Sequence, residues 1–160
     1  RDLGLQLGSD VPFFLQRGTA LVKGRGEHLN YIPWLAAFTY VLVVPTFEIA
    51  TGWAYANYKK ALTENRGYAT FLDSVSPEEI CVSDLYQHLQ NDFLPLILQT
   101  HPEVAQILIE FEKAGAVVAS LSGSGSTLDG VFEDQQKARE AHTIFQKSGY
   151  RVFLCHPVLA

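Results

Sequence analysis

The sequence contains no methionine, and this absence predicts a processed chain or a part of a longer one, because translation starts at methionine. Cysteine is scarce as well: Cys81 and Cys155 lie far apart and lack the spacing of a CxxC or Cys/His metal site. We therefore expect reduced, buried thiols, as in a cytoplasmic protein, rather than a disulfide framework. No apolar run is long enough to cross a bilayer; the longest one, over residues 39–44, has the length of a strand.

Positive charge is in short supply. The chain carries 12 Lys and Arg against 17 Asp and Glu, which gives a formal net charge of -5. This balance argues against nucleic acid or an anionic membrane as the main partner, and leaves room only for a local basic pocket that holds a phosphate. With 160 residues, 48% of them hydrophobic and 18% charged, the chain is predicted to be globular and to bury one core.

The order of the predicted elements favours an α+β fold. After residue 37 we expect a strand, helices, two strands, a helix and a closing strand, at residues 38–44, 49–113, 116–121, 128–132, 135–148 and 150–155. This alternation is the split β-α-β pattern of ferredoxin-like domains. The preceding segment is predicted to form two short strands, at residues 13–15 and 19–22, joined by a hairpin turn over residues 16–18.

Polar caps, prolines and glycines mark the expected helix ends. Thr51 is the predicted N-cap of the first helix after residue 44. The next helix, over residues 83–98, is expected to kink at Pro95. The remaining helix ends are marked by residues that commonly start, cap or follow a helix: Pro102, Gly115, Asp134 and Gly149.

A first candidate site lies near the start of the chain, where residues 7–14 read Leu-Gly-Ser-Asp-Val-Pro-Phe-Phe. Pro12 disfavours a helical conformation at Val11, so a helix arriving through residues 1–9 should end near Asp10. The carboxylate would then stand at a helix-to-strand junction with apolar residues on both sides, where it can present one proton acceptor. On spacing alone, a turn or cap role for Asp10 is the simpler interpretation.

A second candidate is the run Leu-Ser-Gly-Ser-Gly-Ser-Thr at residues 121–127. It lacks the third glycine of G-x-G-x-x-G, since Leu128 stands there, and it has neither a Walker lysine nor a G-x-S-x-G elbow. The pattern predicts a tight turn whose bare backbone can approach an anion or another loop. A plain hairpin turn is the alternative.

These blocks resemble the GHMP kinase superfamily, and within it the kinases that act on diphosphocytidyl-methylerythritol. The similarity rests on five blocks in the same order: Gly-Ser-Asp-Val-Pro-Phe-Phe-Leu at 8–15, Gly-Thr-Ala-Leu-Val at 18–22, Gly-Arg-Gly-Glu at 24–27, Asn-Asp-Phe at 91–93 and Ser-Gly-Ser-Gly-Ser-Thr at 122–127. The resemblance implies a bacterial cytoplasmic enzyme of isoprenoid (terpenoid) biosynthesis that uses ATP and Mg²⁺. It also implies that residues 1–36 are the remnant of an N-terminal, ribosomal S5-like domain and that residues 37–160 form the GHMP C-terminal domain.

The resemblance assigns roles to single residues. Asp10 matches the catalytic aspartate, which takes the proton of the 2-hydroxyl that attacks the γ-phosphate. Tyr55 matches the aromatic residue that stacks on cytosine, and Thr51 a ligand contact, although a half-buried aromatic and a helix cap explain these two equally well. Gly123, Ser124 and Gly125 match a glycine block that lies beside the nucleotide phosphates in the family. The resemblance assigns no residue of this chain to a metal.

Two features of the family have no counterpart, its Gly-Gly-Gly-Ser-Ser-Asp-type ATP loop and the lysine partner of the aspartate, so we expect no activity from this chain alone. Two alternatives stay open: another GHMP kinase, of homoserine, mevalonate or galactose type, or a non-catalytic ferredoxin-like binding module. Asn91 and Asp92 are interpreted as structural polar contacts, and the histidines show no ligand spacing. We expect a small-molecule substrate, no nucleic acid and no membrane.

Overall fold

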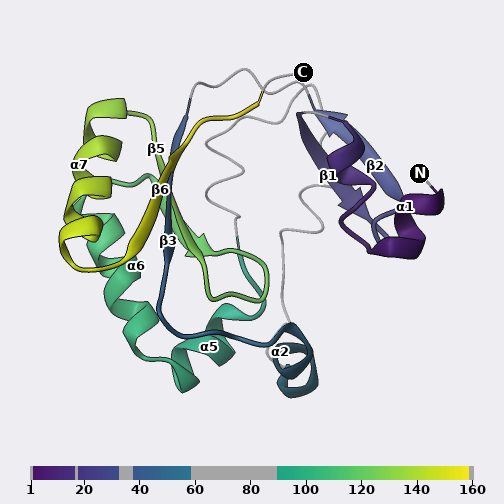
Figure 1. The fold of residues 1–160 in the computed structure, drawn as a ribbon, viewed down its shortest axis with the longest axis horizontal. Helices are drawn as coiled ribbons and strands as arrows, with labels where there is room; N and C mark the ends of the chain where they lie inside the picture. Colours follow the sequence, from purple (N-terminus) through teal and green to yellow (C-terminus); the bar gives the residue numbers. More distant parts are fainter. Residues whose placement is uncertain (1, 17, 33–37, 59–89, 159–160) are drawn as a thin grey trace.

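The computed structural model describes residues 2–16, 18–32, 38–58 and 90–158. Figure 1 shows a four-stranded sheet with helices α6 (Glu103–Lys113) and α7 (Gln135–Lys147) on one face. A two-stranded hairpin, accompanied by helix α1 (Asp2–Leu7), lies apart from that sheet. None of the helices in these ranges combines the length and the apolar character needed to cross a bilayer.

The four-stranded sheet has the order β4-β5-β3-β6, and all three pairings are antiparallel. Its strands in chain order are β3 (Thr39–Val44), β4 (Val118–Leu121), β5 (Leu128–Phe132) and β6 (Arg151–Cys155). The first strand is therefore flanked by the third and the fourth, which is the interleaved order of a split β-α-β sheet. The predicted α+β, ferredoxin-like fold is confirmed.

The alternation of side chains along β3 shows which face of the sheet is covered. Thr39, Val41 and Val43 are buried, whereas the residues between them are only half-buried, as expected when successive side chains point to opposite faces. The helices supply the other half of the core with residues spaced three or four apart: Val104, Ile107 and Phe111 from α6, and Ala138, Ala141 and Phe145 from α7.

Phe111 occupies the centre of this core. Its ring centroid lies 4.5 Å from that of Phe145 and 6.4 Å from that of Phe132. On the sheet side the ring lies directly against the backbone of Gly130, where an added Cβ would overlap the ring carbons. The glycine therefore lets helix α6 approach the middle of the sheet more closely than any other residue would allow.

The predicted helix ends are confirmed where they depend on a single local contact. The Asp134 carboxylate accepts hydrogen bonds from the N–H groups of Gln136, at 2.7 Å, and Lys137, at 3.3 Å, and so caps α7. Gly115 and Gly149, with φ of 85° and 89°, follow α6 and α7 in the left-handed conformation that glycine adopts without strain.

The predicted strand at residues 13–15 and its hairpin turn are wrong. Phe13–Leu15 is a short 3-10 helix (η1), because Pro12, with φ of -59° and ψ of -34°, continues a tight helical turn. The hairpin is formed by β1 (Thr19–Lys23) and β2 (His28–Ile32), and it turns over residues 24–27. Gly24 and Gly26 supply the positive φ angles, 72° and 111°, that this turn requires.

Two predictions about helix starts are also wrong. Helix α2 (Thr51–Asn57) has Ala50 at its N-cap position without a side-chain cap, so Thr51 is the first helical residue. Helix α5 (Leu94–Thr100) begins at Leu94 with Pro95 in its first turn, where no N–H is needed and no kink results. The earlier part of the predicted helix over residues 83–98, and Cys81, lie outside the described residues. Cys155 is a free thiol, but it is half-buried rather than buried as expected.

We predict that Gly130→Ala destabilises the chain by about 1–3 kcal/mol, because the new methyl group overlaps the ring of Phe111 in a filled core. Gly52→Ala is the matched control, since nothing lies within 4 Å of a Cβ added at this helical position. Urea unfolding of both variants measures the difference. If the unfolding midpoint of Gly130→Ala equalled that of the unmodified chain, the core would be able to rearrange around the added methyl group without losing stability.

Candidate functional site

Asp10 lies in a tight turn that follows α1. The N–H of Val11 donates to the carbonyl of Gly8 at 3.2 Å, and the N–H of Phe13 donates to the carbonyl of Asp10 at 3.2 Å. These bonds fix the backbone on both sides of Asp10 while its side chain stays exposed. Within the part of the chain that the structure describes, the Asp10 carboxylate has no hydrogen-bond or ion-pair partner and is free to meet a ligand.

The hairpin turn packs directly against this acidic turn. A Cβ at Gly26 would overlap the carbonyl oxygen of Ser9, so only glycine permits this contact. The hydroxyl of Tyr31 donates to the carbonyl of Phe13 at 3.2 Å, and the two rings stack with centroids 6.5 Å apart. The sequence blocks at residues 8–15 and 24–27, separate in the chain, therefore form one local structure around Asp10.

Glu27 is the second carboxylate of this unit, and it is already engaged. It accepts a hydrogen bond from the N–H of Arg25 at 2.6 Å. Hydrogen bonds from its own N–H and from that of Arg25 hold the pKa of this exposed carboxyl below its usual value. Glu27 therefore stabilises the turn, whereas Asp10 remains available for chemistry.

The glycine-rich residues 122–127 form the connection between β4 and β5. The N–H of Ser122 donates to the carbonyl of Thr127 at 2.9 Å, and the N–H of Gly125 donates to that of Ser122 at 3.0 Å. Gly125 packs inward, since a Cβ there would lie 2.9 Å from Cδ1 of Ile49. Gly123 faces open space, with nothing within 4 Å of an added Cβ, so its backbone is accessible to a ligand.

Helix α2 brings the two predicted substrate residues to this loop. The hydroxyl oxygens of Thr51 and Ser124 lie 3.0 Å apart, within hydrogen-bond distance. One turn further along, the ring of Tyr55 meets that of Phe93 in a T-shaped contact at 5.0 Å, and 66% of the Tyr55 side chain stays exposed. The arrangement holds the aromatic ring in place and leaves surface for a flat ligand.

Asn91 connects the loop to the start of α5. Its amide nitrogen donates to the carbonyls of Leu121, at 2.6 Å, and Gly123, at 2.8 Å, and its amide oxygen accepts from the N–H of Phe93 at 2.8 Å. The interpretation of Asn91 as a structural polar contact is confirmed, although it lies in a turn rather than in a helix. Sequence reasoning gave no sign that its partner is the glycine loop.

The predicted site residues thus fall into two groups. Thr51, Tyr55 and the loop of residues 123–125 are neighbours, while Asp10 belongs to the unit of α1, β1 and β2. Figure 1 shows that unit apart from α2 and from the loop between β4 and β5. The structure accordingly joins the residues predicted for substrate and phosphate, and it holds the predicted base on a different unit.

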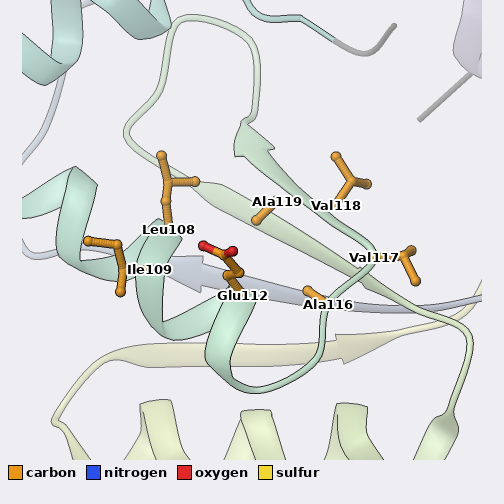
Figure 2. A pocket seen from close by; sticks show the side chains of 7 residues that line it. All are labelled: Leu108, Ile109, Glu112, Ala116, Val117, Val118 and Ala119. Atoms are coloured by element: carbon orange, nitrogen blue, oxygen red, sulfur yellow. The ribbon is translucent and has the colours of Figure 1, made fainter. Parts of the chain in front are cut away.

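A pocket of about 350 Å³ lies elsewhere, between α6 and the edge strand β4. Figure 2 shows its lining, which consists of Leu108, Ile109, Glu112, Ala116, Val117, Val118 and Ala119. The only charged group among these residues is a carboxylate, which repels phosphate-bearing ligands. None of the predicted site residues lines this pocket, and it does not suit a nucleotide.

Metal ligands do not gather among the residues that the structure describes: these contain no group of three or more His, Cys, Asp or Glu side chains able to hold an ion.

Asp129, in β5, is the one titratable group with a strongly raised pKa among the described residues. It lies on the sheet face opposite α6 and α7, where the registers place it beside Ser120 and Leu42. Burial raises its pKa from 3.8 to about 6, because the partly enclosed site disfavours the charged form. No predicted site residue contacts it, so its effect concerns stability rather than the candidate site.

Comparison with known proteins shows which family the chain is similar to. Residues 80–151 match the family model described as "GHMP kinases C terminal". The match covers α5, α6, β4, β5 and α7, which are similar to the C-terminal domain of GHMP kinases, and the resemblance inferred from the motifs is confirmed.

When the whole chain is compared with curated proteins, the relatives described here are kinases of one kind. The chain is 33% identical over 96% of its length to the 4-diphosphocytidyl-2-C-methyl-D-erythritol kinase of Syntrophus aciditrophicus, covering 53% of that relative. It is 34% identical over 97% of its length to the kinase of the same name from Syntrophotalea carbinolica, covering 54% of it. The chain therefore spans about half the length of the curated relatives it matches.

Solved structures support the fold. The crystal structure of a 4-(cytidine 5'-diphospho)-2C-methyl-D-erythritol kinase matches 98% of this chain with a TM-score of 0.74 at 22% identity, over 55% of its own length. The homoserine kinase of Cytophaga hutchinsonii matches 93% of the chain and 50% of its own, with a TM-score of 0.59 at 16% identity. At these identities the likeness concerns the fold alone.

We predict that Asp129→Asn stabilises the chain above about pH 6 by up to about 3 kcal/mol, the equivalent of the pKa difference between 3.8 and about 6. The raised pKa means that the folded state binds the proton more tightly, so stability falls as the pH rises from about 4 to about 6, and the variant lacks this fall. Urea unfolding at about pH 4 and about pH 7.5 measures it, with the exposed Glu133→Gln as control. An equal gain at both values would rule out titration as the cause.

Proposed function

We propose that the complete protein transfers the γ-phosphate of ATP to the 2-hydroxyl of 4-diphosphocytidyl-2-C-methyl-D-erythritol, in isoprenoid biosynthesis by the non-mevalonate route. The observation that carries the proposal is the similarity to kinases of this name, at 33–34% identity over 96–97% of the chain. The relatives matched at this identity are named for this substrate, which favours it over the homoserine, mevalonate and galactose alternatives. The small-molecule substrate expected from the sequence agrees with this choice.

Asp10 is the base in this proposal. Phosphoryl transfer needs an acceptor hydroxyl in line with the γ-phosphate and a group that receives its proton. The hydroxyl oxygen forms the new bond to the γ-phosphorus, the bond from that phosphorus to the bridging oxygen breaks, and ADP leaves. The hydroxyl proton passes to the Asp10 carboxylate, which is exposed and unpaired among the described residues and so available to receive it.

Helix α2 and the glycine loop recognise the substrates. The exposed Tyr55 ring stacks on the cytosine, because the flat face of a base is both apolar and polarisable. Thr51 and Ser124, which already share a hydrogen bond, offer hydroxyl groups to the ligand. Gly123, Ser124 and Gly125 bring bare backbone close to the phosphates, where N–H groups stabilise negative charge.

The division of the chain follows from the same proposal. Residues 1–36 belong to the N-terminal domain of the kinase, and residues 37–160 form its C-terminal domain. The exposed apolar side chains of the first unit agree with this assignment, since they need a further surface to cover them: Leu3, Leu7, Phe14 and Leu15 are all more than 60% exposed.

We predict that Asp10→Asn lowers kcat of the complete protein by roughly 10²- to 10⁴-fold, because the amide cannot take up the proton. ATP-dependent phosphorylation of diphosphocytidyl-methylerythritol is the assay, and Glu133→Gln, which removes another exposed carboxylate, is the control. Full kinase activity in Asp10→Asn would show that Asp10 is not the base. A complete protein that is folded but gives no turnover would refute the proposed reaction. If Asp10→Asn left every activity of the complete protein intact, that result would favour the non-catalytic alternative.

We predict that Tyr55→Ala raises KM for the cytidine substrate by roughly 10-fold, the loss of one stacking contact, and leaves KM for ATP unchanged. Tyr55→Phe keeps the ring and should behave like the unmodified protein. Steady-state kinetics with each substrate varied in turn provide the test. Equal losses in the two variants would mean that the hydroxyl group, and not stacking, holds the substrate.

A further inference from the structure

The turn of Asn91, Asp92 and Phe93, directly before α5, contacts two elements that are distant in sequence. On one side, Asn91 bonds the end of β4 and the glycine loop. On the other, the hydroxyl of Tyr58, which follows α2, donates to the Asp92 carboxylate at 3.1 Å. The ring of Phe93 lies 5.0 Å from that of Tyr55 and 5.5 Å from that of Tyr58. The turn thus bridges α2 and the loop.

Almost all the hydrogen-bonding capacity of the Asn91 side-chain amide is satisfied. Its nitrogen carries two hydrogens, and both go to carbonyl oxygens, while its oxygen accepts the N–H of Phe93. The reverse orientation of the amide would place its oxygen against two carbonyls and its nitrogen against an N–H group, so the three partners determine a single orientation. A side chain without both functions cannot replace it.

The bond to the carbonyl of Gly123 has a consequence for the next residue. The peptide between Gly123 and Ser124 is planar and trans, so the N–H of Ser124 points away from the carbonyl that Asn91 holds. In the described ranges this N–H has no hydrogen-bond partner. The hydroxyl of Ser124 is held separately by Thr51, at 3.0 Å. Asn91 and Thr51 therefore hold this peptide from two sides, and the N–H of Ser124 remains as a donor without a partner in the described ranges.

We propose that Asn91 is a positioning residue, which holds the Gly123–Ser124 peptide so that the N–H of Ser124 is directed at a phosphate oxygen of the nucleotide. The inference rests on the proposed function of the loop. A loop rich in glycine has many accessible conformations, and restricting it before the ligand arrives lowers the entropy that binding must overcome. Preorganised N–H donors also stabilise charge that develops during phosphoryl transfer.

Two variants at this position separate positioning from folding. Asn91→Asp keeps an oxygen for the N–H of Phe93 but sets a second oxygen against the carbonyls of Leu121 and Gly123, whereas Asn91→Ala removes all three bonds. In the complete protein we expect both to lower kcat/KM for ATP by roughly 10²-fold, as for the loss of an oriented donor. Asn91→Asp should keep its melting temperature within a few degrees of the unmodified protein.

The matched control is Asn57→Ala. Asn57 also donates its side-chain amide to a backbone carbonyl, that of Trp53 at 2.8 Å, but this bond stays within one turn of α2. Its kcat/KM should remain within about twofold of the unmodified value, because no loop depends on it. Asn91 variants that lose melting temperature but keep kcat and KM per folded molecule would show a purely structural role and overturn the proposal.

A second readout needs no kinase activity. The amides of Ser122 and Gly125 are hydrogen-bonded inside the loop, and their hydrogen exchange should accelerate by about 10-fold in Asn91→Asp but not in Asn57→Ala. ADP should shift the amide resonance of Ser124 in the unmodified protein and not in Asn91→Asp. Unchanged exchange, or an equal shift in both proteins, overturns the role of Asn91. An inactive unmodified protein refutes the proposed kinase reaction, and these two measurements then decide the role of Asn91 by themselves.

Discussion

Helix α6 approaches the sheet closely where the ring of Phe111 meets the bare backbone of Gly130. This contact determines where the next elements of the chain, strand β4 and the glycine loop, are placed. The carbonyl of Phe111 accepts the N–H of Ala116 at 3.0 Å, so the end of α6 directs the chain into β4 within a few residues. Strand β4 then leads into the glycine loop, whose first residues are held by Asn91. The depth of one helix in the core thereby sets the position of the loop, because interiors packed at crystal density transmit small displacements.

The unit of α1, β1 and β2 depends on a different constraint. Two strands bury little surface, and an isolated hairpin is marginally stable in water. Here the turn of residues 24–27 is instead locked against the acidic turn by backbone contact at Ser9 and by the stacking of Phe13 on Tyr31. The contact at Ser9 leaves no room for a side chain at Gly26, so this position of the turn requires glycine.

Sequence reasoning succeeded where one local interaction decides the structure. Asp134 before a helical pattern predicts a cap, and the apolar run at residues 39–44 predicts a buried strand; both follow from neighbouring residues. It failed at Phe13–Leu15, where aromatic residues favour a strand but Pro12 continues a turn, and at Thr51, whose hydroxyl bonds Ser124 instead of capping its helix. The contacts of Asn91 join residues about 30 positions apart, and no local pattern contains such a partnership. The site residues themselves remain predictions, which come from the resemblance rather than from spacing.

The paired hydroxyls of Thr51 and Ser124 have one further property. Either oxygen can be the donor at their separation of 3.0 Å, so the direction of the bond is reversible. Whichever group donates, the hydrogen of the other is free to rotate toward a third atom. Such a pair acts as an adaptable donor, which can follow an oxygen as it moves or gains charge without any movement of the backbone. The loop can therefore be rigid in its main chain and still accommodate two chemical states of the same ligand.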